Sequence, residues 1–364
     1  MGLEELHGQL QAVARDLLKA GAPDWSLLVG SGWTGLEVPE QLDGAGATFA
    51  ETAVVLREMG RAATCSPYLG VTLAVATLLA AMPGVGQDDL LRRVAAGRER
   101  PVAVLGDWVT IAADGKGTAG LAGETGHSPF CMKGKRITGR AEFVPDAAEA
   151  TRLLIVARLP DRCGWPVIAE VAPGSPGLSV EAQPVVDQTR RLAVVTADDV
   201  EVPSASAWLF SGDDQQEAAE RLLDRAAVAI ACDSLGLMDA MLDATVRYVK
   251  VRNQFGRPVG SFQAVQHACA DMLVQLTISR ELVEAAVRAV ASGDPDAWVA
   301  ASMAKSHVTA AAVDVAGKAM QLHGGIGYTW ESGIHAYLKR ATLNRALFGS
   351  PAQHRRRLAT RYCP

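Results

Sequence analysis

The segment RNQFGRPVGSFQAVQHACADM, residues 252–272, decides the fold of this chain. It follows a long helix-forming stretch, and its FGRPVG piece carries the glycines and the proline that end a helix. A second helix-forming stretch begins near Phe262. The segment therefore predicts two long helices joined by a short connection, which is typical of an antiparallel helix bundle.

Helix-forming patterns lie on both sides of this segment, with apolar residues at intervals of three and four. The piece GDPDAW, from Gly293, separates the second long helix from a third. Long helices joined by short breaks predict a four-helix bundle, whose long helices we expect to drive oligomerisation. The expected helices span residues 3–18, 48–59, 71–82, 215–251, 265–291 and 296–322.

The middle third of the chain changes to short β-rich runs separated by glycine and proline. Such runs indicate an antiparallel sheet or a small barrel, and we expect no strand after residue 230. The expected strands are 102–105, 108–112, 153–156, 166–171 and 192–196. The fold class is therefore mainly α with a central β domain. We expect an N-terminal helical domain at 1–100, a β-barrel-like middle domain at 101–212 and a C-terminal four-helix bundle at 213–364.

Composition and charge exclude several classes of protein. The formal charge of −5 and the lack of a dense basic patch argue against nucleic-acid binding. The apolar run 73–82 is too short to span a membrane, and the N-terminus has no secretory pattern. Six cysteines and seven histidines are scattered, so we expect no metal site and a cytoplasmic protein with reduced thiols. The run Arg355, Arg356, Arg357 is expected to be a solvated helix end.

Arg252 stands at the end of a predicted helix, where two interpretations are open. Its guanidinium offers planar, paired donors that suit a phosphate. Gln254 and Gln263 would add polar contacts, and Phe255 and Phe262 would add flat apolar faces. Alternatively, Arg252 caps helix carbonyls and the aromatic rings fill the core. The residues alone do not decide between these.

The segment QLHGGIGYTWESGIHAYLKR, residues 321–340, carries a pair of glycines at Gly324 and Gly325. Glycine lacks a Cβ, so the backbone at this point can pass close to a ligand. The alternative is a helix that simply ends in glycine.

Together these two segments resemble the paired signatures in the C-terminal bundle of acyl-CoA dehydrogenases. Weaker similarity covers most of the chain and includes GWTGLEVPEQLDGAGA from Gly32, LREMG from Leu56 and DQTRRLAVVTADDVEVP from Asp187. The resemblance implies FAD at a subunit interface, with this chain reaching a flavin held mainly by the neighbouring subunit. The contacts that it implies are Arg252, Gln254, Phe255, Phe262, Gln263, Gln321, His323, Gly324 and Gly325.

The β domain departs from the family pattern. Members that hold the flavin ring carry a Thr-Glu-Pro-bearing stretch and, further on, a Trp-Ile-Thr-like stretch. No Thr-Glu-Pro occurs in DWVTIAADGKGTAGLAGETGHSPF, from Asp107, and Arg136-Ile137-Thr138 stands where the tryptophan-bearing piece is expected. The resemblance therefore implies a degraded flavin-ring pocket, and ordinary sequence divergence is the alternative.

The catalytic base is a second departure. Dehydrogenation needs a carboxylate that removes the Cα proton while Cβ gives a hydride to the flavin. By resemblance, the two family positions for this base fall on Phe348 and near Ala226, neither of which accepts a proton. The tentative candidate is Asp233, whose pKa we expect burial to raise. A structural aspartate bonded to a neighbouring helix is the alternative.

This combination resembles one subunit of the actinobacterial α2β2 heterotetrameric acyl-CoA dehydrogenases of the sterol side-chain type. The first hypothesis is an enzyme subunit for FAD-dependent α,β-dehydrogenation of an acyl-CoA thioester. It implies a second acyl-CoA dehydrogenase subunit and an electron-transfer acceptor as partners. A self-sufficient homo-oligomeric dehydrogenase and a flavin-free scaffold are the alternatives, and the FAD-facing motifs argue against the scaffold.

Overall fold

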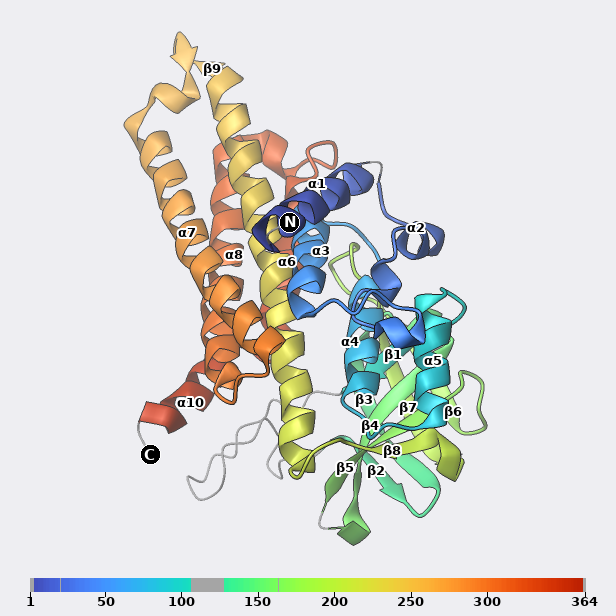
Figure 1. Ribbon diagram of the computed structural model, residues 1–364. Coiled ribbons are helices and arrows are strands. Elements are labelled where there is room, and N and C mark those ends of the chain that lie inside the picture. Colours follow the sequence, from blue (N-terminus) through green and yellow to red (C-terminus); the bar gives the residue numbers. More distant parts are fainter. Residues whose placement is uncertain (1–2, 20, 106–127, 163, 363–364) are drawn as a thin grey trace.

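The computed structural model describes residues 3–19, 21–105, 128–162 and 164–362. Helices lie at both ends of the chain and a sheet lies between them in sequence (Figure 1). The predicted fold class, mainly α with a central β domain, is confirmed. The domain boundaries at 100 and 212 remain a prediction.

The N-terminal helices begin and end close to the predicted positions. Helix α3 starts with a capping box, in which the Thr48 hydroxyl accepts from the Ala50 N–H at 3.1 Å and the Glu51 carboxylate accepts from the Thr48 N–H at 2.8 Å. Two shorter helices, α2 and α5, were not predicted. The helices of this part are α1 (Leu3–Lys19), α2 (Trp25–Gly30), α3 (Phe49–Ala62), α4 (Tyr68–Leu79) and α5 (Val85–Ala95).

In the described part of the chain, one eight-stranded sheet follows, in the order β6-β7-β3-β2-β4-β5-β8 with β1 beside β4. Most neighbouring strands are antiparallel, as predicted. The predicted strand at 108–112 lies outside the described residues. The strands are β1 (Pro101–Val104), β2 (Phe130–Lys133), β3 (Arg136–Pro145), β4 (Arg152–Leu159), β5 (Trp165–Val171), β6 (Leu178–Gln183), β7 (Leu192–Glu201) and β8 (Ala207–Leu209).

Two details of the predicted strands are wrong. Strand β1 runs parallel to β4, and β2 pairs parallel with β4 at one position. Strands β2 and β3 lie between β1 and β4 in the sequence, so the connection is long enough for the crossover that a parallel pair needs. In addition, a two-residue hairpin, β9 (Asn253–Gln254) and β10 (Arg257–Pro258), occurs after residue 230, where we expected none.

The C-terminal part contains three long helices, α6 (Gln215–Val251), α7 (Gln263–Ser292) and α8 (Ala297–His323). They lie side by side, with α7 on the side away from the sheet (Figure 1). The shorter helices α9 (Ile334–Ala346) and α10 (Pro351–Tyr362) pack against α8. In the described residues, three long helices thus form the body of the C-terminal part, with two shorter helices packed against α8.

Helix α10 is anchored by a buried arginine. The Arg357 guanidinium pairs with the Asp224 carboxylate and lies 5.1 Å from the centre of the Trp298 ring. Arg357 is 5% exposed, so the prediction of a solvated helix end is wrong for this residue. Arg355 and Arg356 are exposed.

Helices α3 and α6 cross at two glycines. A Cβ on Gly236 would lie 1.8 Å from the carbonyl oxygen of Arg57, and a Cβ on Gly60 would lie 1.9 Å from that of Asp233. Real Cβ atoms do not approach so closely, so the crossing requires glycine on both helices. This contact fixes the N-terminal helices on the bundle.

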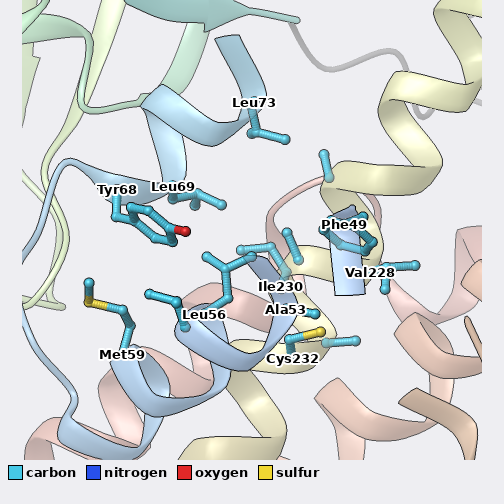
Figure 2. Close-up of a cluster of buried hydrophobic side chains, with 14 of the residues drawn as sticks. Phe49, Ala53, Leu56, Met59, Tyr68, Leu69, Leu73, Val228, Ile230 and Cys232 are labelled. Atoms are coloured by element: carbon cyan, nitrogen blue, oxygen red, sulfur yellow. The ribbon is translucent and has the colours of Figure 1, made fainter. Parts of the chain in front are cut away.

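Apolar side chains fill the space between α3, α4 and α6 (Figure 2). Phe49 and Leu56 from α3, Tyr68 from α4 and Ile230 from α6 are each exposed by 3% or less. None of the helices in the described ranges is long and apolar enough to cross a membrane.

Candidate functional site

A pocket of about 960 Å³ lies at the end of the bundle, where α6 and α8 end and α7 begins. Eight of the nine residues that the resemblance implies as FAD contacts line it, and only Gln263 does not. The eight are Arg252, Gln254, Phe255, Phe262, Gln321, His323, Gly324 and Gly325. The structure thus brings the two sequence segments into one site.

The β9–β10 hairpin forms one wall of this pocket. Its turn residues, Phe255 and Gly256, have φ values of 51° and 78°, as a type I′ hairpin turn requires. The Phe255 side chain is 89% exposed and meets the Phe262 ring edge to face, with ring centroids 6.1 Å apart. A large apolar ring in a left-handed turn, facing solvent, is expected where a ligand or another chain covers it.

Arg252 is exposed in the chain as it stands. Its N–H donates to the Tyr248 carbonyl at 3.0 Å, and its own carbonyl accepts from Val259 at 2.8 Å, so the backbone is fixed. No described carboxylate lies within 4 Å of its guanidinium. Arg252 is therefore not buried against carboxylates of the described chain, and its exposed side chain is available to an anion.

The glycine pair forms the opposite wall. Gly324 has φ 61° and ψ −143°, a conformation that in practice only glycine adopts. A Cβ on Gly325 would meet no atom of the described residues within 4 Å. Since no described part of the chain requires glycine at Gly325, the position suits close approach of a ligand to the backbone.

His323 and Tyr248 join the two helix ends behind the glycines. Their rings stack with centroids 4.5 Å apart and planes at 23°. His323 Nδ1 lies 2.7 Å from the Ala319 carbonyl, to which it must donate, so in the neutral ring Nε2 is an acceptor. This stack holds α6 and α8 at a fixed separation across the pocket.

Sequence reasoning missed several residues of the lining, among them Tyr248, His267, Asp271 and Lys318. Helix spacing could have found two of them. Tyr248 lies four residues before Arg252, and Lys318 lies three before Gln321, so each shares a helix face with an identified residue. Lys318 lies 3.3 Å from Asp271 and adds a second cation to the pocket.

The lining fits the part of FAD that the resemblance assigns to it. Arg252 and Lys318 suit a pyrophosphate, the phenylalanines suit flat apolar groups, and the glycines leave the backbone accessible. The volume is in the range typical of cofactor pockets. These assignments remain proposals for each residue.

Asp233 lies elsewhere, in the middle of α6. It is 2% exposed and accepts from Arg340 at 3.0 and 2.5 Å, from Asn344 at 2.7 Å and from Arg190 at 3.0 Å. Burial alone would raise its pKa, but the charges of Arg190 and Arg340 outweigh burial and lower the pKa to about 2. The expected rise is therefore wrong.

This geometry supports the structural alternative for Asp233. Arg340 also donates to the backbone carbonyls of Thr64, at 2.9 Å, and Thr189, at 3.1 Å. The cluster thus ties the N-terminal helices, the sheet and the bundle together. Asp233 precedes Arg252 by about five helical turns, which is about 28 Å along α6.

Phe348 follows α9 in a turn with left-handed backbone, at φ 52°. Lys305, fully buried on α8, donates to the carbonyls of Asn344 at 3.0 Å and Gly349 at 2.6 Å. His354 lies 3.0 Å from the Phe348 carbonyl through Nε2. This turn is thus held in place, and it presents an apolar ring at the family position of the base. Ala226, the other position, is fully buried.

A cavity of about 170 Å³ lies between Phe348 and the end of β3. Glu142, Phe143, Val144 and Pro145 line it from the sheet. Sequence reasoning placed the Trp-Ile-Thr-like stretch at Arg136–Thr138, but Arg136 is exposed at the start of β3 and bonds to Asp199. The residues that face the bundle are therefore Glu142 to Pro145. The expected Thr-Glu-Pro region lies largely within 106–127, outside the described residues.

Comparison with known proteins identifies the family. Residues 6–98 match the model of the acyl-CoA dehydrogenase N-terminal domain, and residues 216–363 match that of the C-terminal domain. Acyl-CoA dehydrogenase IpdE2 of Mycolicibacterium smegmatis is 32% identical over 92% of this chain and 86% of its own. IpdE2 of Mycobacterium tuberculosis is 33% identical over 92% and 85%.

Solved structures are also similar to this chain. A variant of the Tcur3481-Tcur3483 steroid ACAD superposes with a TM-score of 0.83 at 29% identity, covering 99% of this chain and 98% of the other. The ChsE4-ChsE5 complex from Mycobacterium tuberculosis superposes with a TM-score of 0.84 at 23% identity, covering 98% and 96%, which shows a shared fold.

Proposed function

This chain belongs to the acyl-CoA dehydrogenase family, and we propose that it serves there as the subunit that completes the FAD site of a catalytic partner chain. The family consists of FAD-dependent oxidoreductases that act on the CH–CH bond of acyl-CoA. The observation that carries the proposal is an asymmetry between two sites of this chain. The pocket at the bundle end has a volume of about 960 Å³, whereas the described residues around Phe348, the family position of the base, enclose a cavity of about 170 Å³.

The open pocket provides what a partner's cofactor needs from this chain. Arg252 is exposed and has no ion pair among the described residues, and Gly324 and Gly325 leave backbone exposed beside it. FAD bound there supplies the hydride acceptor for the acyl chain. The residues of this chain bind and orient the phosphate end, and Arg252 neutralises its charge. None of these residues takes part in proton transfer.

The described residues at the two family positions of the base argue against independent catalysis. The cavity at Phe348, about 170 Å³, is well below the roughly 300–1,000 Å³ of typical cofactor and ligand pockets. Phe348 and Ala226 cannot accept a proton, and the pKa of Asp233 is lowered by two arginines that occupy its oxygens. The space between α3, α4 and α6 is packed with buried side chains (Figure 2).

One observation favours a self-sufficient enzyme as the second candidate. Glu142 lines the Phe348 cavity, so this cavity does contain a carboxylate. However, Glu142 accepts from Arg140 at 2.8 Å and is exposed on the strand, which ties it to solvent rather than to an enclosed site.

The face of α7 that points away from the bundle supports an oligomer. Leu273, Val274 and Ile278 are 52%, 55% and 43% exposed on this face. Beside them, a groove of about 450 Å³ between α6 and α7 is lined by Leu242, Val246, Cys269 and Leu273, among others. Contiguous exposed apolar surface of this kind is typical of protein interfaces. We assign it to the assembly with the partner or with a second copy.

The relatives suggest the substrate class. A steroid ACAD is among the similar structures, so we assign an acyl-CoA with a sterol-derived acyl group to the assembled enzyme. An electron-transfer acceptor would reoxidise the flavin. We also propose an α2β2 stoichiometry for the complex and a cytoplasmic location.

The test is to purify the chain alone and co-expressed with an acyl-CoA dehydrogenase encoded beside it. For the chain alone we expect little bound FAD and negligible acyl-CoA oxidation with an artificial acceptor. For the co-expressed complex we expect bound FAD and acyl-CoA oxidation. Arg252→Ala should weaken FAD retention in the complex by about 1–3 kcal/mol, since it removes a charge-assisted hydrogen bond. Arg356→Ala, an exposed arginine on α10, is the control. One FAD per chain and turnover by the chain alone would favour the self-sufficient enzyme.

A further inference from the structure

An exposed aromatic surface follows the glycine pair. Ile326, Tyr328 and Trp330 are 45%, 68% and 68% exposed on one short segment between α8 and α9. Large side chains this exposed, three within five residues, are uncommon on a surface that only solvent covers. Together with Lys339 they are called the Trp330 face below.

Trp330 is held in position before anything binds to it. Its ring meets the His335 ring edge to face, with centroids 4.5 Å apart and planes at 80°. The Lys339 ammonium lies 4.9 Å from the ring centroid. The Trp330 carbonyl accepts from the Gly333 N–H at 3.2 Å. An aromatic side chain that is already oriented loses little conformational entropy on binding, which is a property of interface hot spots.

The charge around this face is mainly positive. Within the described ranges, no carboxylate lies within 4 Å of the Lys339 ammonium. On the neighbouring pocket, Arg252 has no ion pair among the described residues, whereas Lys318 is paired with Asp271, and Glu331 is the acidic residue of the segment itself. The face therefore suits a surface of acidic and apolar side chains.

The Trp330 face continues the rim of the FAD pocket. Ile326 and Thr329 line that pocket, and Tyr328 and Trp330 do not. A ligand that fills the pocket would thus reach Ile326 and leave the indole uncovered. A chain that brings a cofactor into the pocket must pass over this rim.

We propose that the Trp330 face is a docking site for the flavin-carrying partner chain, which covers Trp330 with an acidic and apolar segment. The proposal rests on the proposed function, because it takes the chain that delivers FAD to be the occupant. It adds a recognition element outside the cofactor pocket, so that partner binding does not depend on FAD contacts alone.

Hydroxyl-radical footprinting of Trp330, read by mass spectrometry, tests the proposal in three samples: the chain alone, the chain with excess FAD, and the chain co-purified with its partner. We expect rapid oxidation in the first two and strong protection in the third. Trp330→Ala should weaken the complex about 30-fold, the effect of an interface hot spot. Trp165→Ala is the control, since Trp165 is 46% exposed on β5.

The outcomes separate this proposal from the proposed function. Protection of Trp330 by FAD alone would make the face part of the nucleotide site and overturn the proposal. If Trp330 in a complex that contains FAD is oxidised as rapidly as in the chain alone, the proposal is overturned as well, while the proposed function stands. A colourless complex that protects Trp330 supports the docking site but contradicts the FAD role. If no complex forms, both proposals fail.

Discussion

Asp233 shows how the partners of a buried group decide its chemistry. A carboxylate among apolar residues resembles a base with a raised pKa, but two arginines surround this one and lower its pKa to about 2. Removing one member of a buried ion pair leaves the other charges unpaired, which costs more than the pair itself contributes. Asp233 thus contributes to the stability of the fold.

Replacement of Asp233 tests this role. We expect Asp233→Asn to lower the free energy of unfolding by about 3–5 kcal/mol, because Arg190 and Arg340 stay buried without their anion. The activity of the folded complex should be largely intact. Urea denaturation provides the measurement, with Asp213→Asn, an exposed aspartate, as the control. A stable variant that abolishes turnover would instead restore Asp233 as a candidate base.

Low pH should remove the stabilisation that the ionised Asp233 carboxylate gives to the fold. The pKa of Asp233 is lower in the folded state than the ordinary 3.8, so the unfolded state binds the proton more tightly. The stabilisation is therefore present above pH 3.8 and lost as the pH falls toward about 2. Urea denaturation between pH 4 and 2 should show a steeper loss in the natural chain than in Asp233→Asn. Parallel pH profiles would show that Asp233 is not ion-paired in the fold.

At the scale of elements, buried groups fix the turn after α9. Burial lowers the pKa of Lys305 to about 7, although its ammonium bonds to the carbonyl of Asn344, near the end of α9, and to that of Gly349, in the turn that follows. The unfolded chain holds this proton up to its ordinary pKa of 10.5. Stability from this residue therefore rises with pH between about 7 and 10.5.

Lys305→Met should remove that rise. We expect the natural chain to gain stability relative to the variant from pH 7.5 to pH 9.5, with a slope of at most about 1.4 kcal/mol per pH unit. Chemical denaturation at several pH values measures the difference. A constant difference across this range would mean that the Lys305 pKa is near its ordinary value.

The crossing of α3 and α6 makes a second prediction at this scale. Gly236→Ala should destabilise the chain by about 1–3 kcal/mol, since its Cβ would overlap the Arg57 carbonyl and force the helices apart. Gly8→Ala is the control, because Gly8 is exposed in α1 with open space around it. Helix propensity predicts a small gain there. Thermal denaturation of both variants decides whether close approach or propensity dominates.

At the scale of the whole molecule, the exposed face of α7 predicts an assembly. Ile278→Asp should reduce the oligomer to a smaller species, because a carboxylate in an apolar interface loses its hydration without a partner. Sedimentation of the complex gives the measurement. Ala352→Asp, on the exposed side of α10, is the control and should leave the mass unchanged. An unchanged oligomer for Ile278→Asp would place the interface elsewhere.

Local pattern was enough to predict much of this fold. Helix α6 begins and ends at the predicted residues, because its helix-forming pattern, the cap at Asp214 and the FGRPVG break are all local signals. The two motifs also located the pocket at the bundle end, which we propose binds FAD, since each motif lies at a helix end and the bundle brings helix ends together. The parallel pairing of β1 with β4 was not predictable, because β4 lies about 50 residues after β1 and local sequence does not show which strand it will pair with.

By itself the sequence determined the long helices, the place of the pocket and the absence of a carboxylate at Phe348 and Ala226. The tertiary structure decided which groups meet. Arg190 and Arg340 reach Asp233 from distant parts of the chain and reverse the direction of its pKa, and Asp224 draws Arg357 into the core. Burial follows from local composition, but electrostatic energy depends on the distance to charges that only the folded chain brings together.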